Sequence, residues 1–300
     1  MIDKQLDKKK TILITGGAGF IGSHLCEWLA QDPANKVISL DNYFTGTKEN
    51  HVHGVEYREG HTKDIEKLVT EEVAVIYHLG EYARTEASFD DVPLVFDMNI
   101  VGTLAVLEFC RKRKPKLVYA GSSTKFADGG LGRDQSPYAW TKATNTDLVR
   151  NYSEWFDFPY AITYFYNVYG PGERAGRIGT LIEIFRQKYL AGEPLTVRLP
   201  GTQRRNFTHV DDIVRGIILV GQKGSGDEYG LGNEESYSVL EIAQMFAAPI
   251  TMVPERKGNR MSGKIDTSRM KNEFDWKAEK SIKDYIAGIV AEKKNTAEHA

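Results

Sequence analysis

The sequence has little cysteine, no long apolar run and almost no net charge. Its 300 residues include two cysteines, Cys26 and Cys110, which both lie in apolar stretches. Two such residues provide neither a disulfide framework nor a metal-ligand spacing, so we expect buried free thiols in a reducing cytoplasm. No stretch of about 18 apolar residues occurs, and no apolar run follows the charged N-terminal residues. These absences argue against a membrane-spanning or exported protein.

Positive charge is not in excess either. The chain has 39 lysines and arginines against 41 aspartates and glutamates, for a formal net charge of −2. Nucleic acids and anionic membranes are held by an extended basic surface, so neither is an expected partner. The histidines show no metal-ligand spacing, and we expect no metal site. An anionic ligand would therefore need a local arrangement of donors and positive charges.

The chain instead shows short β-branched runs that alternate with longer helical patterns. This order is typical of βαβ units, in which helices cover both faces of a parallel sheet. It predicts an α/β fold with a Rossmann-type, doubly wound parallel sheet. The predicted strands are Thr11–Thr15, Val37–Leu40, Val73–His78, Leu117–Ala120 and Ala161–Tyr166, and the two longest helices are Val92–Lys112 and Pro137–Phe156.

The spacing of the patterns becomes irregular after about residue 170. We expect residues 1–169 to form a dinucleotide-binding domain, and residues 170–300 to form mainly a smaller C-terminal substrate-binding lobe, with some segments returning to the sheet. The expected elements of this second part are the helices Thr180–Ala191, Asp211–Val220, Val239–Phe246 and Ile282–Lys293 and the strand Leu195–Val197.

Three glycines lie between the first strand and the helix that follows it. Gly16 permits a tight turn, Gly19 lets a pyrophosphate approach the backbone, and Gly22 lets the helix pack on the strand. The helix N-terminus would then carry the phosphate charge. An ordinary strand-to-helix turn is the alternative, but Asp41 ends the next strand, where an acid accepts hydrogen bonds from the adenosine ribose. Because Asp41 would repel a 2′-phosphate, NAD is favoured over NADP.

A phenol and an ammonium lie one helical turn apart, at Tyr138 and Lys142. Tyrosine is a weak base near neutral pH, but a nearby positive charge stabilises its phenolate. Tyr138 could then accept the proton of a substrate hydroxyl while a hydride leaves for the nicotinamide. A surface pair without a role is the alternative. Ser123, just after the strand Leu117–Ala120, favours the catalytic interpretation, because ligands bind at the carboxyl edge of such sheets.

Together these segments resemble the extended branch of the short-chain dehydrogenase/reductase superfamily, and within it the nucleotide-sugar epimerase/dehydratase group. The resemblance extends from about Lys10 to Asp284. It is carried by Gly16-x-x-Gly19-x-x-Gly22, Tyr77-His78-Leu79-Gly80, Asn99-x-x-Gly102-Thr103, Tyr138-x-x-x-Lys142, Tyr164-x-x-Asn167-Val168-Tyr169-Gly170-Pro171 and Gln203-x-Arg205-Asn206-Phe207.

The resemblance implies roles for individual residues. Ser123, Tyr138 and Lys142 match the family's catalytic hydroxyl, tyrosine and lysine. The implied cofactor is NAD, contacted by the three glycines, by Tyr138 and Lys142, and by Phe20, Ile21, Asp41, Asn42, Asp64, Leu79, Gly80, Tyr82, Asn99 and Phe165. The implied substrate is a nucleotide-diphosphate sugar, contacted by Ser123, Thr124, Lys125, Tyr166 and Asn167 and by two diphosphate-binding arginines, Arg205 and Arg256.

The chain departs from the family pattern near the catalytic serine. Sugar 4,6-dehydratases carry an Asp-Glu pair where this chain has Thr124-Lys125, and dehydration needs a carboxylic acid to protonate the leaving hydroxyl. A 4,6-dehydratase is therefore disfavoured. The interval between Ser123 and Tyr138 is also shorter than usual, and the loop that it lacks usually forms one wall of the sugar pocket. Three further positions differ: His61 stands where an acid is usual, Tyr164 replaces an arginine and Asn206 replaces an aspartate.

These observations predict an enzyme that oxidises a ring hydroxyl, at C4, of a nucleotide-linked sugar. In a 4-epimerase the keto sugar turns over in the site and takes the hydride back on its other face. A 4-dehydrogenase that yields a keto sugar is the main alternative, and the short interval after Ser123 keeps it open. A non-catalytic NAD-binding sensor is disfavoured because Tyr138 and Lys142 are both present. The base and the sugar are left open.

The resemblance also implies a homodimer, while the expected free thiols and the missing export signal predict a cytoplasmic location. In such dimers the helices Val92–Lys112 and Pro137–Phe156 pair with their mates as a four-helix bundle. Both helices would then need apolar residues on their outward faces as well as their inward ones. Candidates for these positions are Leu94, Val101, Leu104, Ala105, Leu148 and Trp155.

Overall fold

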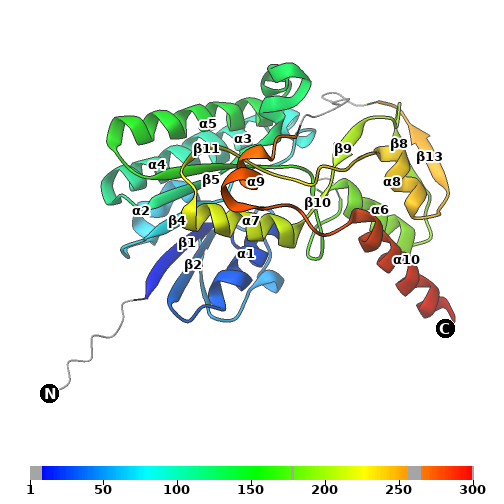
Figure 1. The fold of residues 1–300 in the computed structure, drawn as a ribbon, viewed down its shortest axis with the longest axis horizontal. Helices are drawn as coiled ribbons and strands as arrows, with labels where there is room; N and C mark the ends of the chain where they lie inside the picture. Colours follow the sequence, from blue (N-terminus) through cyan, green and yellow to red (C-terminus); the bar gives the residue numbers. More distant parts are fainter. Residues whose placement is uncertain (1–8, 177–178, 256–264, 299–300) are drawn as a thin grey trace.

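The central element of the fold is a seven-stranded sheet in which every neighbouring pair is parallel (Figure 1). The computed structural model describes residues 9–176, 179–255 and 265–298. The strand order is β11-β6-β5-β4-β1-β2-β3, so the winding reverses between β1 and β4. This arrangement confirms the predicted Rossmann-type sheet. Its strands are β1 (Lys10–Thr15), β2 (Asn35–Asp41), β3 (Val55–Glu59), β4 (Val75–His78), β5 (Lys116–Ser122), β6 (Tyr160–Phe165) and β11 (Gly226–Leu231).

Helices cover both faces of the sheet, as a doubly wound fold requires. Figure 1 shows α1 and α7 on one face, and α2, α4 and α5 on the other. Ile14 of β1 belongs to one apolar cluster, with Leu25 and Ile217. The preceding residue, Leu13, points to the opposite face and belongs to a second cluster with Val106, as the alternation of side chains along a strand dictates. The helices are α1 (Phe20–Ala30), α2 (Ile65–Leu68), α4 (Gly102–Arg113), α5 (Pro137–Phe156) and α7 (Val210–Lys223).

The predicted helix Val92–Lys112 has a change of winding inside it. α3 (Val92–Phe96) continues into a π-helical turn at Asp97–Val101, and this turn continues into α4. Such turns often occur where one side chain has a special task. Here the turn contains Asn99, whose Oδ1 accepts the Tyr82 N–H at 2.6 Å and whose Nδ2 donates to the Tyr82 carbonyl at 3.1 Å. The π turn thus places a side chain that holds the loop after β4 by two hydrogen bonds.

Among the described residues, one stretch, Val92–Arg113, is long and apolar enough to cross a membrane by length and composition alone. Core helices of soluble proteins meet the same criteria, so such a helix is weak evidence for a membrane span. In this structure Asn99 and Thr103 have no exposed surface, whereas Val101 and Leu104 are 47% and 40% exposed. The stretch is therefore apolar because one of its faces is buried in the protein core and another carries exposed apolar side chains.

The last part of the chain forms a lobe beside the sheet, at the right of Figure 1. Phe185 of α6, Ile242 of α8 and Ile286 of α10 are fully buried in its apolar core. Three pairs of short strands, β7–β10, β9–β12 and β8–β13, connect its segments. Its elements are β7 (Val168–Tyr169), α6 (Leu181–Leu190), β8 (Leu195–Arg198), β9 (Arg204–Asn206), β10 (Thr208–His209), β12 (Ser236–Ser238), α8 (Val239–Met245), β13 (Ile250–Val253), α9 (Ser268–Phe274) and α10 (Ile282–Glu298).

Two segments of residues 170–300 belong to the main sheet layer. β11 extends the sheet by pairing in parallel with β6, and α7 packs beside α1. The expected helices and strand of this region are present, with their ends shifted by one or a few residues. Short 3₁₀ segments lie at Lys48–Asn50, Thr62–Asp64, Ala87–Phe89 and Ser123–Asp134.

Two helical glycines allow a matched test of the glycine turn. A Cβ at Gly22 in α1 would lie 2.0 Å from the carbonyl oxygen of Gly16, whereas a Cβ at Gly288 in α10 would meet no atom within 4 Å. Because the added atom must displace the turn, we expect Gly22→Ala to lower the free energy of unfolding by about 2 kcal/mol. Gly288→Ala should raise it, by up to about 1 kcal/mol, because alanine is favoured in helix interiors. Urea unfolding measures both changes, and a Gly22→Ala protein as stable as the parent would contradict the prediction.

Candidate active site

The glycine turn is built from close backbone contacts. Gly16 has a φ of +75°, and a Cβ there would lie 2.9 Å from the Cα of Gly80, just after β4. The predicted cofactor residues Leu79 and Gly80 therefore lie against the turn. Phe20 and Ile21 open α1, so the turn leads into a helix N-terminus whose backbone N–H groups can receive a pyrophosphate.

Asp41 ends β2 and binds the same turn. Its Oδ2 accepts the N–H of Ala18 at 2.9 Å, and its Oδ1 accepts the N–H of Tyr43 at 2.8 Å. Burial raises the pKa of Asp41, while these two hydrogen bonds oppose the rise. Asn42 beside it is exposed, and its side chain accepts the N–H of Phe44 at 3.1 Å. The turn, the helix N-terminus and this carboxylate together fit a dinucleotide with a free ribose 2′-hydroxyl.

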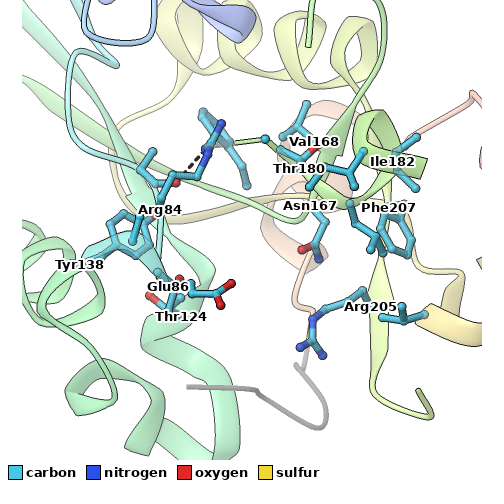
Figure 2. Close-up of a pocket in the computed structure, with 18 of the residues that line it drawn as sticks. Arg84, Glu86, Thr124, Tyr138, Asn167, Val168, Thr180, Ile182, Arg205 and Phe207 are labelled. Carbon is cyan, nitrogen blue, oxygen red and sulfur yellow. Dashed lines mark hydrogen bonds between the residues drawn. The ribbon is translucent and has the colours of Figure 1, made fainter. Parts of the chain in front are cut away.

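A cavity of about 920 Å³ opens beside this turn. Figure 2 shows its two walls, with Tyr138, Thr124 and Arg84 on one side and Asn167 and Arg205 on the other. The first wall comes from the loop after β4, the end of β5 and α5, and the second comes from the lobe and the segment after β6. This volume is in the range of small-molecule sites. The predicted site residues that line the cavity are Phe20, Ile21, Ser123, Thr124, Tyr138, Phe165, Asn167 and Arg205.

Tyr138 lies in the first turn of α5 and faces the cavity. Ser136 caps this helix by accepting the N–H of Ala139 at 3.1 Å, and Pro137 occupies the first helical position. Both features favour a helix start at this point, so the backbone of Tyr138 is held firmly. Its hydroxyl donates to the Oγ of Ser122 at 3.2 Å.

The hydroxyl groups at the end of β5 form a short series of hydrogen bonds that leads to Tyr138. Ser122 Oγ and Thr124 Oγ1 are 2.8 Å apart. Ser123, which the resemblance assigns as the catalytic hydroxyl, lines the same cavity and is 8% exposed. The hydroxyl bonded to Tyr138 in this structure is that of Ser122, for which the sequence predicted no catalytic role. Lys125 follows in the same 3₁₀ segment, and its side chain lies outside the described part of the structure.

Lys142 lies one turn further along α5 and is buried. Its ammonium forms an ion pair with Glu81, donates to the carbonyl of Ala120 and lies 4.5 Å from the ring centre of Tyr119. The side chains of Lys142 and Glu81 are 6% and 3% exposed. Sequence reasoning missed Glu81. The available signal was a carboxylate placed only three residues after a buried strand.

Arg84 is a second residue that sequence reasoning missed. It comes from the same loop after β4 and lies beside Tyr138 at the cavity wall (Figure 2). Burial lowers the pKa of Arg84, while nearby tyrosine and glutamate side chains oppose this. Further along the loop, Glu86 pairs with Arg198 of β8 at 3.3 Å, and both line the cavity. The loop thus brings to the cavity two charged groups, Arg84 and Glu86, that the sequence did not predict there.

Three predicted cofactor residues are bonded to other parts of the protein. Tyr82 is fully buried, and its hydroxyl donates to Asp91 at 2.7 Å. Asn99, also fully buried, is the clamp on the Tyr82 backbone. Asp64 ends a 3₁₀ turn and lies 3.2 Å from the ammonium of Lys67. These contacts show that the three side chains interact with other parts of the protein. Their contact with a cofactor stays a prediction.

The predicted diphosphate contacts lie on the opposite wall. Asn167 has a φ of +31° and donates through Nδ2 to the carbonyl of Asn206 at 3.0 Å. Arg205 comes from β9 and lines the cavity. Arg256, its predicted partner, lies outside the described residues. Asn206 itself donates to three carbonyls, those of Asn233, Glu234 and Glu235, at 3.0 to 3.1 Å, which explains why an amide replaces the family's aspartate.

Three successive aromatic residues lie at the end of β6: Tyr164 and Phe165 are its last residues, and Tyr166 follows it. Phe165 lines the cavity, as predicted for a cofactor residue. Tyr166 is 4% exposed, does not line the cavity, and accepts the N–H of Asp266 at 3.3 Å through its hydroxyl. Tyr164 donates its hydroxyl to Asp227 of β11 at 2.6 Å. The tyrosine that replaces the family's arginine therefore connects β6 to the edge strand of the sheet.

Two further predictions concern the cysteines and a metal site. Cys26 and Cys110 are free and buried, as predicted, and burial raises the pKa of both thiols, that of Cys26 to about 12. Within the described ranges, no group of three or more His, Cys, Asp or Glu residues is arranged to hold a metal ion. His61, which replaces an acid of the family pattern, accepts the N–H of Lys63 and so caps a 3₁₀ turn.

Comparison with known proteins relates this geometry to a family. The pattern of the NAD dependent epimerase/dehydratase family matches residues 12–232. UDP-glucuronic acid decarboxylase 6 of Arabidopsis thaliana is 28% identical over 299 residues, which cover 91% of this chain and 85% of that protein. The dTDP-D-glucose 4,6-dehydratase of Dictyostelium discoideum is 30% identical over 265 residues, which cover 78% of this chain and 60% of that protein. The solved structure of the Thermus thermophilus UDP-glucose 4-epimerase in complex with NAD is 25% identical, with a TM-score of 0.85 and coverage of 95% of this chain and 99% of that chain.

These relatives carry out different reactions on nucleotide sugars, and the comparisons do not distinguish among them for this chain. The matched range contains the glycine turn, Asp41, the hydroxyls after β5, and the Tyr138/Lys142 pair. On the extent of this match and the geometry of the turn, the chain belongs to the NAD dependent epimerase/dehydratase family, with NAD as its cofactor.

Proposed function

We propose that the chain catalyses NAD-dependent oxidoreduction at the C4 hydroxyl of a nucleotide-diphosphate sugar, as a 4-epimerase that works through a 4-keto sugar. The observation that carries this proposal is the position of Tyr138, which faces a cavity whose opposite wall holds Asn167 and Arg205. The similarity to the Thermus thermophilus UDP-glucose 4-epimerase supports the epimerase outcome.

The residues of the cavity divide the work between its two walls. When bound, NAD supplies a reversible hydride acceptor. Tyr138 accepts the proton of the C4 hydroxyl, and Ser123 orients that oxygen by a hydrogen bond. Asn167 and Arg205 hold the diphosphate on the opposite wall. In a 4-epimerase the keto ring would then turn within the cavity, and Tyr138 would return the proton to the C4 oxygen when the hydride is given back to the other face of C4.

A 4-dehydrogenase is a second candidate, favoured by the short interval before α5. Residues Ser123–Asp134 form one 3₁₀ segment that leads almost directly into the helix. This leaves little chain to enclose a sugar ring, and an open pocket favours release of the keto sugar. A 4,6-dehydratase is disfavoured, because Thr124 stands where that reaction needs a carboxylic acid.

Incubation with UDP-, GDP-, CDP- and dTDP-sugars tests the reaction. We expect one sugar to give its C4 stereoisomer without net formation of NADH, because the same hydride is returned. Absorbance at the NADH band and the configuration of the product measure the two quantities. A released keto sugar, with one NADH for each turnover, would contradict the epimerase and support the dehydrogenase.

Substitutions at the hydroxyl groups test the assignment of the base. We expect Tyr138→Phe to lower kcat by about 10² to 10⁴-fold while the protein still binds NAD, because proton transfer is lost. Ser123→Ala should lower kcat by about 10²-fold, because Ser123 is assigned to the substrate oxygen. Ser122→Ala should lower it by about 10-fold or less, because Ser122, which also lines the cavity, is hydrogen-bonded to Tyr138. Steady-state kinetics measure these changes. A Tyr138→Phe protein with full turnover would refute the assignment of Tyr138 as the base.

We also propose a cytoplasmic homodimer formed through α4 and α5 and their mates. An apolar stripe supports this interface: Val101, Leu104, Trp140 and Trp155 are 47%, 40%, 42% and 61% exposed on these helices and the adjoining π turn. Exposed apolar residues in such number mark an interaction surface. The two buried free thiols support a reducing compartment.

Light scattering tests the dimer. The parent protein should have twice the mass of one chain, and Leu104→Glu should shift it toward the monomer, because a charge would be buried in the bundle. Lys112→Glu, on the same helix but at its exposed end, serves as the control for an added acidic group. A monomeric parent protein would rule out the interface.

We further propose that residues 170–300 act mainly as the substrate lobe, and residues 1–169 as the NAD-binding domain that carries Ser123, Tyr138 and Lys142. The division is supported by the two walls of the cavity, since Arg205 comes from the lobe and Tyr138 from the sheet layer.

A further inference from the structure

A buried ion pair lies behind the catalytic tyrosine. Glu81 follows β4, and its carboxylate pairs with the ammonium of Lys142, each side chain being at most 6% exposed. Three neutral donors complete the surroundings of the carboxylate: the hydroxyls of Thr103 at 3.0 Å and Tyr119 at 3.1 Å, and the Nδ2 of Asn145 at 2.9 Å. A buried carboxylate keeps its charge only where its oxygens are satisfied in this way.

The electrostatics of the pair favour its charged form. Burial by itself would raise the pKa of Glu81, but the charge of Lys142, that of His78 when it is protonated, and hydrogen bonds from Lys142 and Asn145 lower it. His78 of β4 faces the same carboxylate, and burial, with Lys142 in addition, lowers the pKa of His78 to about 4 against the opposing effect of Glu81. His78 is therefore neutral at physiological pH.

The other ionisable groups around the pair come from the neighbouring elements. β5 contributes Tyr119, whose pKa is raised well above its usual value by burial and by Glu81. α5 contributes Tyr138, the loop itself contributes Arg84, and α4 presents Thr103, which does not ionise. Among these groups Glu81 therefore supplies the negative charge, and Lys142 and Arg84 supply the positive charges.

We propose that Glu81 is a positioning residue for Lys142 in the reaction. An ammonium has three hydrogens, and the bonds to Glu81 and Ala120 fix the direction of two of them. The carboxylate also supplies the counter-charge that offsets the cost of burying the ammonium. The inference rests on the proposed role of Tyr138, because the charge of Lys142 stabilises the phenolate of that residue.

Glu81→Gln keeps the size of the side chain and removes its charge. We expect kcat to fall by about 10-fold or more, because Lys142 is less often charged and in place. The KM for the nucleotide sugar should change by less than about twofold, because Glu81 does not line the cavity. The profile of kcat/KM against pH should move to lower pH, because the ammonium gives up its proton earlier and, while charged, acts on Tyr138 without the opposing carboxylate.

Glu71→Gln is the matched control. Glu71 pairs with Arg58 and Lys36, away from the cavity, so the substitution also removes a carboxylate from an ion pair. We expect Glu71→Gln to cost stability but to leave the position of the pH profile unchanged, because Glu71 has no part in the proposed reaction. If Glu71→Gln moved the profile as Glu81→Gln does, the proposal would be overturned.

A measurement without turnover completes the test. NMR of the lysine Nζ groups, with the signal of Lys142 identified by its loss in Lys142→Met, should show the ammonium losing its proton at lower pH in Glu81→Gln than in the parent. Should Glu81→Gln fold poorly, the double variant Glu81→Gln/Lys142→Met should unfold at a higher temperature than either single variant, because no unpaired buried charge remains.

The outcomes separate this inference from the proposed function. Full activity of Tyr138→Phe would refute the role of Tyr138 as the base, on which the inference rests, while leaving the NMR result to stand. If Tyr138→Phe is inactive but Glu81→Gln lowers kcat with the pH profile and the Nζ titration unmoved, Glu81 has a structural role and the positioning role is overturned. The positioning role is confirmed if the pH profile and the Nζ titration both move to lower pH in Glu81→Gln and neither moves in Glu71→Gln.

Discussion

The catalytic edge of the sheet depends on buried polar groups that satisfy one another. His78, at the end of β4, bonds Thr15 of β1 at 2.7 Å through Nδ1 and Thr103 of α4 at 3.0 Å through Nε2. Thr103 and Asn145 of α5 then both reach Glu81. Loss of any one of these partners would leave a buried polar group without a hydrogen bond, at a cost of about 1 to 3 kcal/mol. The network therefore holds two strands and two helices in one relative position, and Tyr138 projects from one of those helices.

The parts of the candidate site that could be placed in space from the sequence are those fixed by one local segment or by the edge that parallel strands share. Gly16 and Gly22 are separated by a single turn, so their spacing implies the close contact between them. Asp41 could be placed because parallel strands end at the same edge of the sheet. The same reasoning placed Ser123 and Tyr138 at one cavity, although it did not show that Ser122 holds the hydroxyl of the tyrosine.

The features that sequence reasoning missed depend on contacts between distant segments. Glu81 and Lys142 are 61 positions apart, and no pattern along either segment reveals that they meet. The π turn before α4 follows from the clamp of Asn99 on Tyr82, which is also a contact between two segments. Likewise, an amide at position 206 makes sense only once the carbonyls of residues 233–235 are seen beside it. Periodicity describes one element at a time, so such tertiary requirements stay invisible to it.

The route of the chain between sheet and lobe has a mechanical consequence. The chain leaves the sheet layer after β6, returns through α7 and β11, and leaves again toward β12 and α8. Asp212 of α7 adds a further attachment by accepting the N–H groups of Glu279 and Lys280 at 3.0 and 2.9 Å. A lobe fastened at several points cannot swing open on a single hinge. We therefore expect the two walls of the cavity to keep a nearly constant separation, which suits the rotation of a keto sugar in the proposed reaction.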